Sequence, residues 1–121
     1  MTSSRQELGR WGETLAANYL DRNGYRVIER NLRTPFGEID LVAEEGPMLV
    51  FVEVKTRSSK SFGHPEEVIT PQKLTHMIES AESYLQENSA LDLPWRIDVI
   101  AVQKNPTDQA PEIVHFENVA D

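Results

Sequence analysis

Hydrophobic and polar positions follow two periods along the chain, and these periods predict the elements of the fold. Continuous or alternating apolar runs predict strands, and apolar residues spaced three or four apart predict helices. The predicted strands are 25–30, 38–43, 48–57, 95–102 and 112–119. The first predicted helix, 5–22, has the apolar stripe Leu8, Trp11, Leu15 and Tyr19. A second helix is expected from the Thr70-Pro71 start to Glu87. The predicted order is therefore α-β-β-β-α-β-β.

The connections between the predicted strands determine how the sheet pairs. The segment "NLRTPFG" is expected to be a turn or loop, because proline and glycine interrupt regular structure. The tetrapeptide "EEGP" is expected to close an antiparallel hairpin with Ala43 opposite Met48. The helix between the third and fourth strands permits a right-handed crossover and parallel pairing. We therefore expect an α/β fold with a mixed β-sheet flanked by helices.

Length and composition describe one globular domain spanning residues 1–121. Hydrophobic residues make up 39% and charged residues 26%, which is ordinary for a soluble protein. The chain has no cysteine, so disulfides and thiolate metal sites are excluded. The N-terminal segment is polar and lacks the apolar run of a signal peptide, and the longest apolar run, "PMLVFV", is too short to cross a bilayer. We expect a cytoplasmic protein without a membrane partner.

The net charge of -8 argues at first against a nucleic-acid partner, because phosphate binding is mostly cationic. The charge is unevenly distributed, however. Residues 1–33 and 54–76 each carry a balance of +2, whereas 34–53 carry -5 and 77–121 carry -7. The acidic C-terminal part is typical of a solvated face. A nucleic-acid partner therefore remains compatible with the two cationic segments.

The strand "MLVFVEVKTR" places Glu53 and Lys55 inside an apolar run. Buried strands avoid charge unless it is paired or used. Alternation puts both side chains on one face, and a hairpin loop of even length puts Asp40 on that face too, about 7–8 Å from Glu53 between backbones. One interpretation is an exposed ion pair of little energetic value. The other is a pair of carboxylates that binds a divalent cation, with a lysine that assists phosphodiester hydrolysis.

Five segments in a fixed order resemble one family of sequences. They are "GRWGETLAANYLDRNGYRVIERNLR", "GEIDLVA", "LVFVEVKTR", "FGHPEEVITPQK" and "RIDVIAV". Asp40 and the "EVK" of the third strand resemble the D…E-x-K signature of the PD-(D/E)XK nuclease superfamily. More narrowly, the chain resembles the bacterial YraN-like family of predicted endonucleases, which is similar to archaeal Holliday-junction resolvases. A bare E-x-K is a weak motif, but this series covers nearly the whole chain and is specific.

The resemblance implies a restriction-endonuclease-like three-layer core with its site on the hairpin face. It implies Mg²⁺ or Mn²⁺ as the cofactor, Asp40 and Glu53 as metal ligands and Lys55 as the catalytic lysine. The carbonyl of Val54 is a further implied ligand. Related resolvases also use a glutamate of the first helix, and Glu13 matches that position. By helical geometry alone, Glu13 is equally a solvent-facing acid on the flank of the apolar stripe.

Four other polar residues are candidates for a supporting role. Gln72 and Lys73 open the second helix, where a helix N-terminus favours anions such as phosphate, although an exposed first turn explains them equally well. Arg33 and Arg57 flank the strands of the candidate site and are candidates for contacts with DNA phosphates. Scattered surface arginines also occur without any such role.

Five further residues are assigned to structure rather than chemistry. His64 lies in the polar loop "SSKSFGHPEE" and has no partner at metal-ligand spacing. Asp98 lies in an apolar strand and is expected to be a structural partner, for example of an arginine. Trp11, Trp95 and Phe116 are assigned to the core or to an interface rather than to base stacking.

Two functions of different classes follow. The first is a metal-dependent endonuclease that hydrolyses phosphodiester bonds in DNA, including branched or junction DNA. The alternative is a nucleic-acid-binding or protein-interaction module with a nuclease-like fold and no efficient cleavage. The resemblance to resolvases, which cut two strands with two sites, also makes a homodimer an expectation, although no segment specifies its interface.

Overall fold

The computed structural model describes residues 4–58, 69–105 and 109–120. Its helices are α1 (Ser4–Arg22) and α3 (Pro71–Glu87). Its strands are β1 (Arg26–Thr34), β2 (Gly37–Glu45), β3 (Met48–Arg57), β4 (Trp95–Gln103) and β5 (Glu112–Phe116). The predicted order α-β-β-β-α-β-β is confirmed. The loop with His64 lies outside the described residues.

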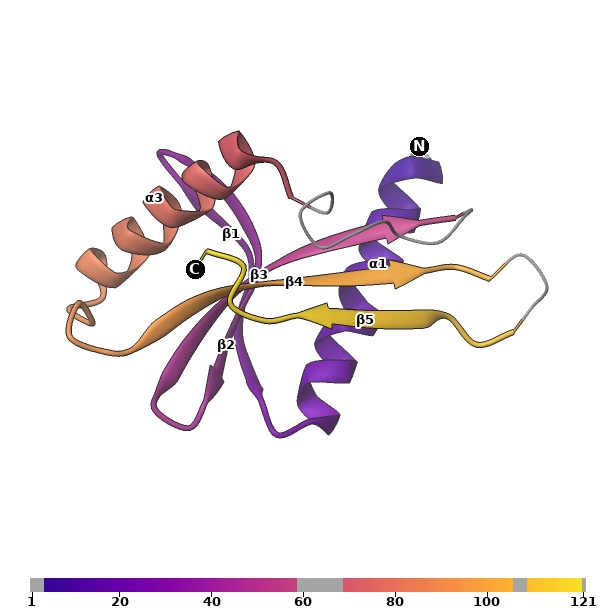
Figure 1. The fold of residues 1–121 in the computed structure, drawn as a ribbon, viewed down its shortest axis with the longest axis horizontal. Coiled ribbons are helices and arrows are strands. Elements are labelled where there is room, and N and C mark those ends of the chain that lie inside the picture. Colours follow the sequence, from indigo (N-terminus) through magenta and orange to yellow (C-terminus); the bar gives the residue numbers. More distant parts are fainter. Residues whose placement is uncertain (1–3, 59–68, 106–108, 121) are drawn as a thin grey trace.

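The strands form one mixed sheet in the order β1-β2-β3-β4-β5. All neighbouring strands pair antiparallel except β3 and β4, which pair parallel. The connection between these two strands contains α3, so the expected crossover with parallel pairing is confirmed. Figure 1 shows α1 on one face of the sheet and α3 on the other. The fold is thus the α/β arrangement of helix, sheet and helix that the pattern predicted.

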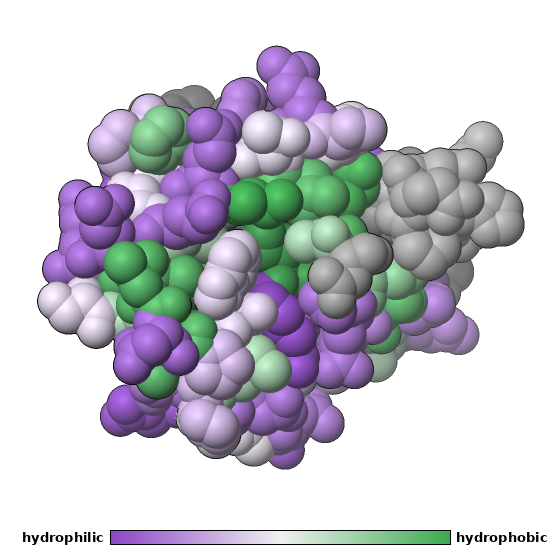
Figure 2. Space-filling view, turned by 60° about the vertical axis from the view of Figure 1, so that its left-hand side comes forward, coloured by the Kyte–Doolittle hydropathy of each residue, from purple (hydrophilic) through white to green (hydrophobic). Residues whose placement is uncertain are grey.

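A hydrophobic core fills each of the two spaces between sheet and helix. Alternate residues of β3 serve the two cores, because Leu49 and Phe51 pack with α3 whereas Val50 and Val52 pack with α1. The Phe51 ring meets Tyr84 of α3 edge-on, with ring centroids 5.7 Å apart. In the space-filling view of Figure 2, hydrophobic side chains also reach the surface between hydrophilic regions.

The hairpin between β2 and β3 is tighter than expected. Its turn has two residues, Gly46 and Pro47, and Glu45 pairs with Met48, so the predicted four-residue turn is wrong. Gly46 has φ 58°, a left-handed conformation that glycine adopts without strain, and this closes the turn early. The register moves by two positions compared with the prediction. A shift of two positions preserves which residues face each side in the paired part of the hairpin, where Val42 and Phe51 share one core and Leu41 and Val52 the other. The alternation does not continue through Asp40, because Ile39 and Val42 pack in the same core.

Two other strand ends differ from the prediction by three residues or more. The segment expected to be a loop belongs largely to β1, which runs to Thr34 and pairs Leu32 with Ile39. Only Pro35 and Phe36 form the turn there, because pairing with β2 outweighs the local turn preference. At the other end of the chain, β5 stops at Phe116 rather than at residue 119.

The buried face of α1 differs from the expected stripe and contains two small residues, Gly12 and Ala16, besides Leu20. Gly12, Ala16 and Leu20 are buried, whereas the predicted stripe of Leu8, Trp11, Leu15 and Tyr19 is only half-buried. A Cβ atom on Gly12 would lie 2.0 Å from Thr56 Oγ1, so only glycine allows α1 to approach β3 this closely. Bulky residues therefore flank the contact line. Within the described residues, neither helix is long and apolar enough to cross a membrane.

Candidate functional site

Asp40 lies where the backbone pairing of β2 and β3 ends. The last paired residues are Leu41 and Val52, and the same register continued by one position places Asp40 beside Glu53. Instead of a further backbone bond, Asp40 Oδ2 accepts a hydrogen bond of 2.8 Å from the Val54 N–H. The side chain thus replaces a rung of the ladder, which fixes the Asp40 carboxylate next to β3.

Glu53 is a buried acid in the middle of the sheet, only 7% exposed. Its Oε2 atom is buried and has no hydrogen-bond partner. Lys73 Nζ lies 3.6 Å from Oε2, and Lys55 Nζ lies 4.0 Å from Oε1. Both ammonium groups therefore form ion pairs with this carboxylate, at distances longer than an ordinary hydrogen bond.

The electrostatics of these acids reflect burial and mutual repulsion. Burial, reinforced by the charge of Asp40, raises the pKa of Glu53 to about 7, and the charges of Lys73 and Lys55 only partly oppose this. Burial likewise raises the pKa of Asp40, although the hydrogen bond from Val54 opposes it. Ionising both carboxylates at once is therefore unfavourable unless a further cation is present.

Glu13 extends from α1 toward the same region. Burial and then the charge of Asp40 raise its pKa, which indicates that the two acids are near each other. Asn31 of β1 lies between Glu13 and Glu38. Its φ of 53° is a left-handed conformation that asparagine tolerates well. With its amide nitrogen turned toward them, Asn31 donates to Glu13 Oε1 at 3.0 Å and to Glu38 Oε1 at 3.3 Å. Sequence reasoning missed Asn31, because its segment was expected to be a loop.

Of the remaining predicted site residues, the structure brings Lys73 to the carboxylates and places Arg33, Gln72 and Arg57 at exposed positions. Lys73 reaches the carboxylates from the first turn of α3, which Thr70 caps by accepting a hydrogen bond from the Lys73 N–H. The Val54 side chain packs toward α1. Arg33 is 89% exposed in its side chain and faces Glu38 at 3.8 Å rather than the buried acids. The exposed residues Gln72 and Arg57 lie at the ends of α3 and β3.

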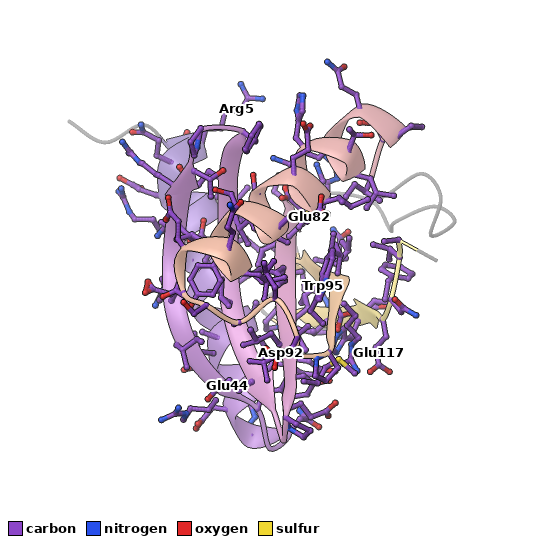
Figure 3. All side chains as sticks on the ribbon, turned by 90° about the vertical axis from the view of Figure 1, so that its left-hand side faces the viewer. Arg5, Glu44, Glu82, Asp92, Trp95 and Glu117 are labelled. Carbon is purple, nitrogen blue, oxygen red and sulfur yellow. The ribbon has the colours of Figure 1, made fainter. Side chains whose placement is uncertain are left out.

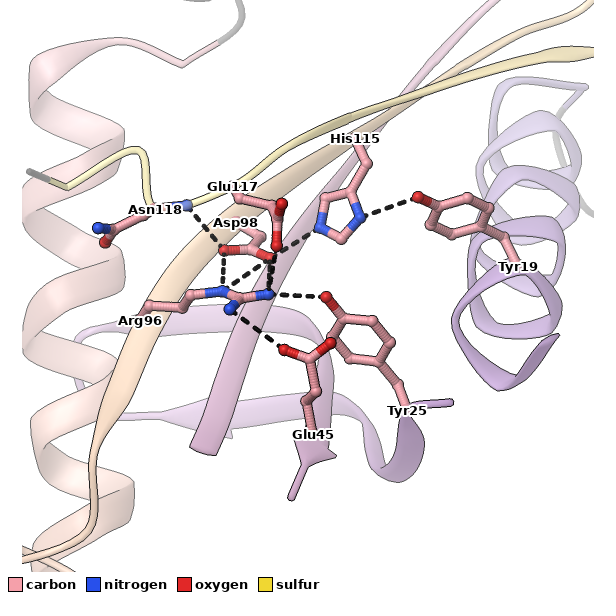
Figure 4. Close-up of polar contacts among 8 residues, drawn as sticks. All are labelled: Tyr19, Tyr25, Glu45, Arg96, Asp98, His115, Glu117 and Asn118. Atoms are coloured by element: carbon pink, nitrogen blue, oxygen red, sulfur yellow. Dashed lines mark hydrogen bonds and ion pairs between the residues drawn. The ribbon is translucent and has the colours of Figure 1, made fainter. Parts of the chain in front are cut away.

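A second polar cluster lies around Asp98, on the face of the sheet that α1 covers (Figure 4). Asp98 is fully buried, and its Oδ1 accepts a 3.0 Å hydrogen bond from Arg96 Nε. Its Oδ2 lies 2.7 Å from His115 Nε2, and the Asn118 N–H donates to Oδ1 at 2.9 Å. Burial alone would raise the pKa of Asp98, but these hydrogen bonds outweigh burial and lower it. The expected partnership of Asp98 with an arginine is confirmed.

Sequence reasoning missed that this cluster also gathers metal-ligand types. Asp98, His115 and Glu117 each offer a ligand atom within 4.8 Å of the others, so this group, of which Asp98 is buried and Glu117 exposed, could hold a metal ion. Among the described residues, no other three His, Asp or Glu side chains have ligand atoms this close together. The described carboxylates around Asp40 therefore do not all lie within this limit of one another. Arg96, however, already donates to Glu117 at 2.8 Å and to Asp98. The guanidinium therefore supplies the positive charge that a metal would bring.

The fold and the site together define a class of protein. It is an α/β protein in which acids and lysines gather at the point where the backbone pairing of β2 and β3 ends. The model of the uncharacterised protein family UPF0102 matches residues 12–102. A UPF0102 protein of Syntrophotalea carbinolica is 46% identical over 121 residues, covering 100% of this chain and 97% of the relative. One of Chlorobaculum parvum is 48% identical over 107 residues, covering 86% and 81%. The chain belongs to the UPF0102 family, which is the YraN-like family that its motifs indicated.

A weaker likeness was found among solved structures. SfsA of Pyrococcus furiosus, in complex with Ca²⁺, superimposes with a TM-score of 0.44 and 12% sequence identity, over 90% of this chain and 63% of SfsA. This likeness is too distant to carry an argument about the fold or the activity of the present chain.

Proposed function

We propose that the protein is a metal-dependent endonuclease that hydrolyses phosphodiester bonds in DNA, with branched or junction DNA among its candidate substrates. One observation carries the proposal. Glu53 is buried beside Asp40, has an oxygen with no hydrogen-bond partner and faces Lys55. That oxygen has an ion pair of 3.6 Å with Lys73 but no hydrogen bond, and a buried carboxylate oxygen without a hydrogen bond costs stability, which favours a further ligand there.

The residues at this site fit a hard divalent cation. Carboxylate oxygens are the ligands that Mg²⁺ and Mn²⁺ prefer, and the buried Glu53 Oε2, which has no hydrogen bond, is one such donor. Asp40 and Glu53 would hold the ion, with Glu13 and the Val54 carbonyl as further ligands that the family resemblance implies. When bound, the metal would supply Lewis-acid stabilisation of the phosphate and a lowered pKa of bound water.

The protein's own groups have separable tasks in this proposal. Asp40 is held in place by its hydrogen bond from Val54, which keeps its carboxylate aimed at the site. The Lys55 ammonium, 4.0 Å from Glu53, would orient the attacking water and stabilise the charge that develops on the phosphate. Lys73 would contact a phosphate oxygen from the first turn of α3.

The remaining expectations belong to the same proposal. Gln72, Arg33 and Arg57 are candidate contacts to DNA phosphates outside the acidic centre. A homodimer would give two sites for two strands, as in resolvases, and the cytoplasm remains the expected location. The competing proposal is a nucleic-acid-binding or protein-interaction module that keeps this fold without efficient cleavage.

A cleavage assay separates the two proposals. Purified protein is incubated with linear and four-way-junction DNA in Mg²⁺, in Mn²⁺ and in EDTA. We expect nicking that requires a metal and is lost in Lys55→Ala and Asp40→Ala. Glu82→Gln, on the exposed side of α3, is the matched control and should cleave normally. Binding of DNA without cleavage in either metal would reject the nuclease and favour the module.

A further inference from the structure

A pocket of about 550 Å³ lies beside the N-terminal half of α1. Its lining includes Arg5, Glu7, Leu8, Trp11, Ser58 and Lys104. We propose that this pocket binds an unpaired nucleotide of the nucleic acid, a proposal that rests on the nuclease function above and specifies its substrate class. Cations, hydroxyls and an aromatic ring are the groups that recognise a phosphate, a sugar and a base.

In this proposal Trp11, which the sequence assigned to the core or an interface, also provides the platform for the base. It is only half-buried: it packs against the hydrophobic core under α1, and it also lines the pocket. The core contact fixes the indole in place, so stacking a base on it needs little ordering of the side chain. A base that remains in a duplex has both faces covered by its neighbours, whereas an unpaired base can stack on an aromatic side chain. The ring therefore favours single-stranded segments.

Two cations of the pocket provide the place for a phosphate. Lys104 Nζ lies over the face of the Trp11 ring, 5.8 Å from its centroid, in a cation–π contact, and Arg5 lines the same pocket. A base that stacks on this face would displace the ammonium from the ring toward its own phosphate. A nucleotide carries its phosphate only a few bonds from its base. Glu7 is the acid among the described lining residues, so cations outnumber acids there. The pocket thus combines positive charge with an aromatic ring, the groups that bind the phosphate and the base of a nucleotide.

The distribution of charged residues over the molecule would direct nucleic acid to the end that carries the pocket and Arg5. Figure 3 shows Arg5 at one end of the molecule and Glu44, Asp92 and Glu117 toward the other. The net charge of -8 therefore need not repel DNA at the pocket, because the field at short range is that of the local groups. Salt screens the distant acids more than the adjacent cations.

The pocket is close enough to the proposed active site for one strand to reach both. Figure 1 shows the C-terminal ends of β3 and β4 beside the N-terminal half of α1, in agreement with the contact of Gly12 with Thr56. Ser58 lies three residues beyond Lys55, about 10 Å along an extended chain. Lys55 faces the side of α3, so the strand would pass over the end of β3, where Arg57 is exposed. The substrate would then be a nucleic acid with unpaired nucleotides next to the cleaved bond.

The test uses the fluorescence of Trp11, since Trp11 and Trp95 are the two tryptophans of the chain. In Trp95→Phe, Trp11 is the sole indole fluorophore. This variant is titrated with a short oligothymidylate and with a duplex of equal length, in EDTA so that no cleavage occurs. We expect saturable quenching by the single strand and weaker quenching by the duplex. If Trp95→Phe does not fold, the oligothymidylate is added to the wild type and to Trp11→Phe, and quenching should disappear in the variant.

Charge variants test the phosphate contact independently of the indole. Lys104→Gln and Arg5→Gln should each weaken single-strand binding several-fold and lower the salt dependence by about one ion, measured by the anisotropy of a labelled strand. Arg26→Gln is the matched control, because Arg26 is 77% exposed and pairs with Glu44, away from the pocket. Its affinity should equal that of the wild type.

The outcomes distinguish this proposal from the nuclease proposal. Binding without quenching of Trp11, equal quenching by the duplex, or equal losses in Arg26→Gln and Lys104→Gln would each overturn the nucleotide pocket. The nuclease would survive those results if metal-dependent cleavage were still observed. Conversely, quenching and charge effects as expected, without cleavage in any metal, would uphold the pocket and remove the nuclease.

Discussion

Replacing Glu53 by glutamine should stabilise the metal-free protein above neutral pH. In the folded protein the pKa of Glu53 rises from 4.5 to about 7, mainly because burial and the charge of Asp40 disfavour its ionised form. The folded state therefore binds this proton more tightly than the unfolded state does. The free energy of unfolding should accordingly fall as pH rises from about 4.5 through about 7, and stay low above that.

The size of this effect follows from the shift in pKa. Each unit corresponds to about 1.4 kcal/mol, so ionised Glu53 costs on the order of 3 kcal/mol. Glutamine keeps the shape of the side chain without the charge. Lys55 and Lys73 lose a partner in this variant, but their side chains are 32% and 39% exposed, so water compensates most of that loss. The variant should gain a large part of the 3 kcal/mol.

Urea unfolding followed by circular dichroism measures this gain. Wild type and Glu53→Gln are unfolded at about pH 5 and about pH 8, in EDTA and in excess Mg²⁺. Wild type should lose stability between the two pH values in EDTA and regain about 2.7 kcal/mol when Mg²⁺ reaches a hundred times its dissociation constant. Glu53→Gln should show little dependence on pH or Mg²⁺, and Glu82→Gln should behave as the wild type.

The result that would refute this reasoning is a Glu53→Gln variant that is less stable than wild type at about pH 8 in EDTA. It would mean that Lys55 and Lys73 pair with Glu53 well enough to stabilise its charge. Equal stabilisation of wild type and variant by Mg²⁺ would place the cation elsewhere.

Further substitutions test the site and the fold. Lys55→Ala should lower cleavage by about 100-fold or more in single-turnover assays while leaving the stabilisation by Mg²⁺ intact. Gly12→Ala should destabilise the protein by about 1–3 kcal/mol in urea, because its Cβ would meet Thr56 at 2.0 Å, and adding Thr56→Ala should recover part of the loss. Asp98→Asn should cost about 3–5 kcal/mol in the same assay, because Arg96 would keep a half-buried charge without its buried partner. A loss below about 1 kcal/mol would contradict the structural role of this pair.

Local pattern was enough to place the strand that carries the site. Glu53 and the valines beside it follow the strict alternation of a buried strand, so their faces are determined by period two. The faces of the paired residues Val42 and Phe51 were predicted despite a wrong turn length, since two-residue and four-residue turns have the same parity. The break in alternation between Ile39 and Val42, where Asp40 bonds to the Val54 N–H, was not predicted. The turn length could not be predicted, because the sequence permits both a four-residue turn that includes Glu44 and Glu45 and the observed two-residue turn. The observed turn depends on the left-handed conformation of Gly46.

Other features depend on contacts between distant segments, which a single sequence does not specify. The "NLRTPFG" segment joined β1 because β2 pairs with it, and Asn31 then came to lie between Glu13 and Glu38. The apolar stripe of α1 was misassigned because the helix contacts the sheet through Gly12. The absence of a side chain there allows the close approach, and a hydrophobic pattern does not reveal such a contact. His115 reaches Asp98 only through the pairing of β4 with β5.

The position of a bound metal tests the central claim most directly. Crystals of the protein soaked in Mn²⁺ can be measured for anomalous scattering, which locates the ion without reference to activity. The account predicts a peak between the carboxylates of Asp40 and Glu53 that is lost in Glu53→Gln. A peak at Asp98, His115 and Glu117 in its place, or none at Asp40 and Glu53 at saturating Mn²⁺, would contradict it.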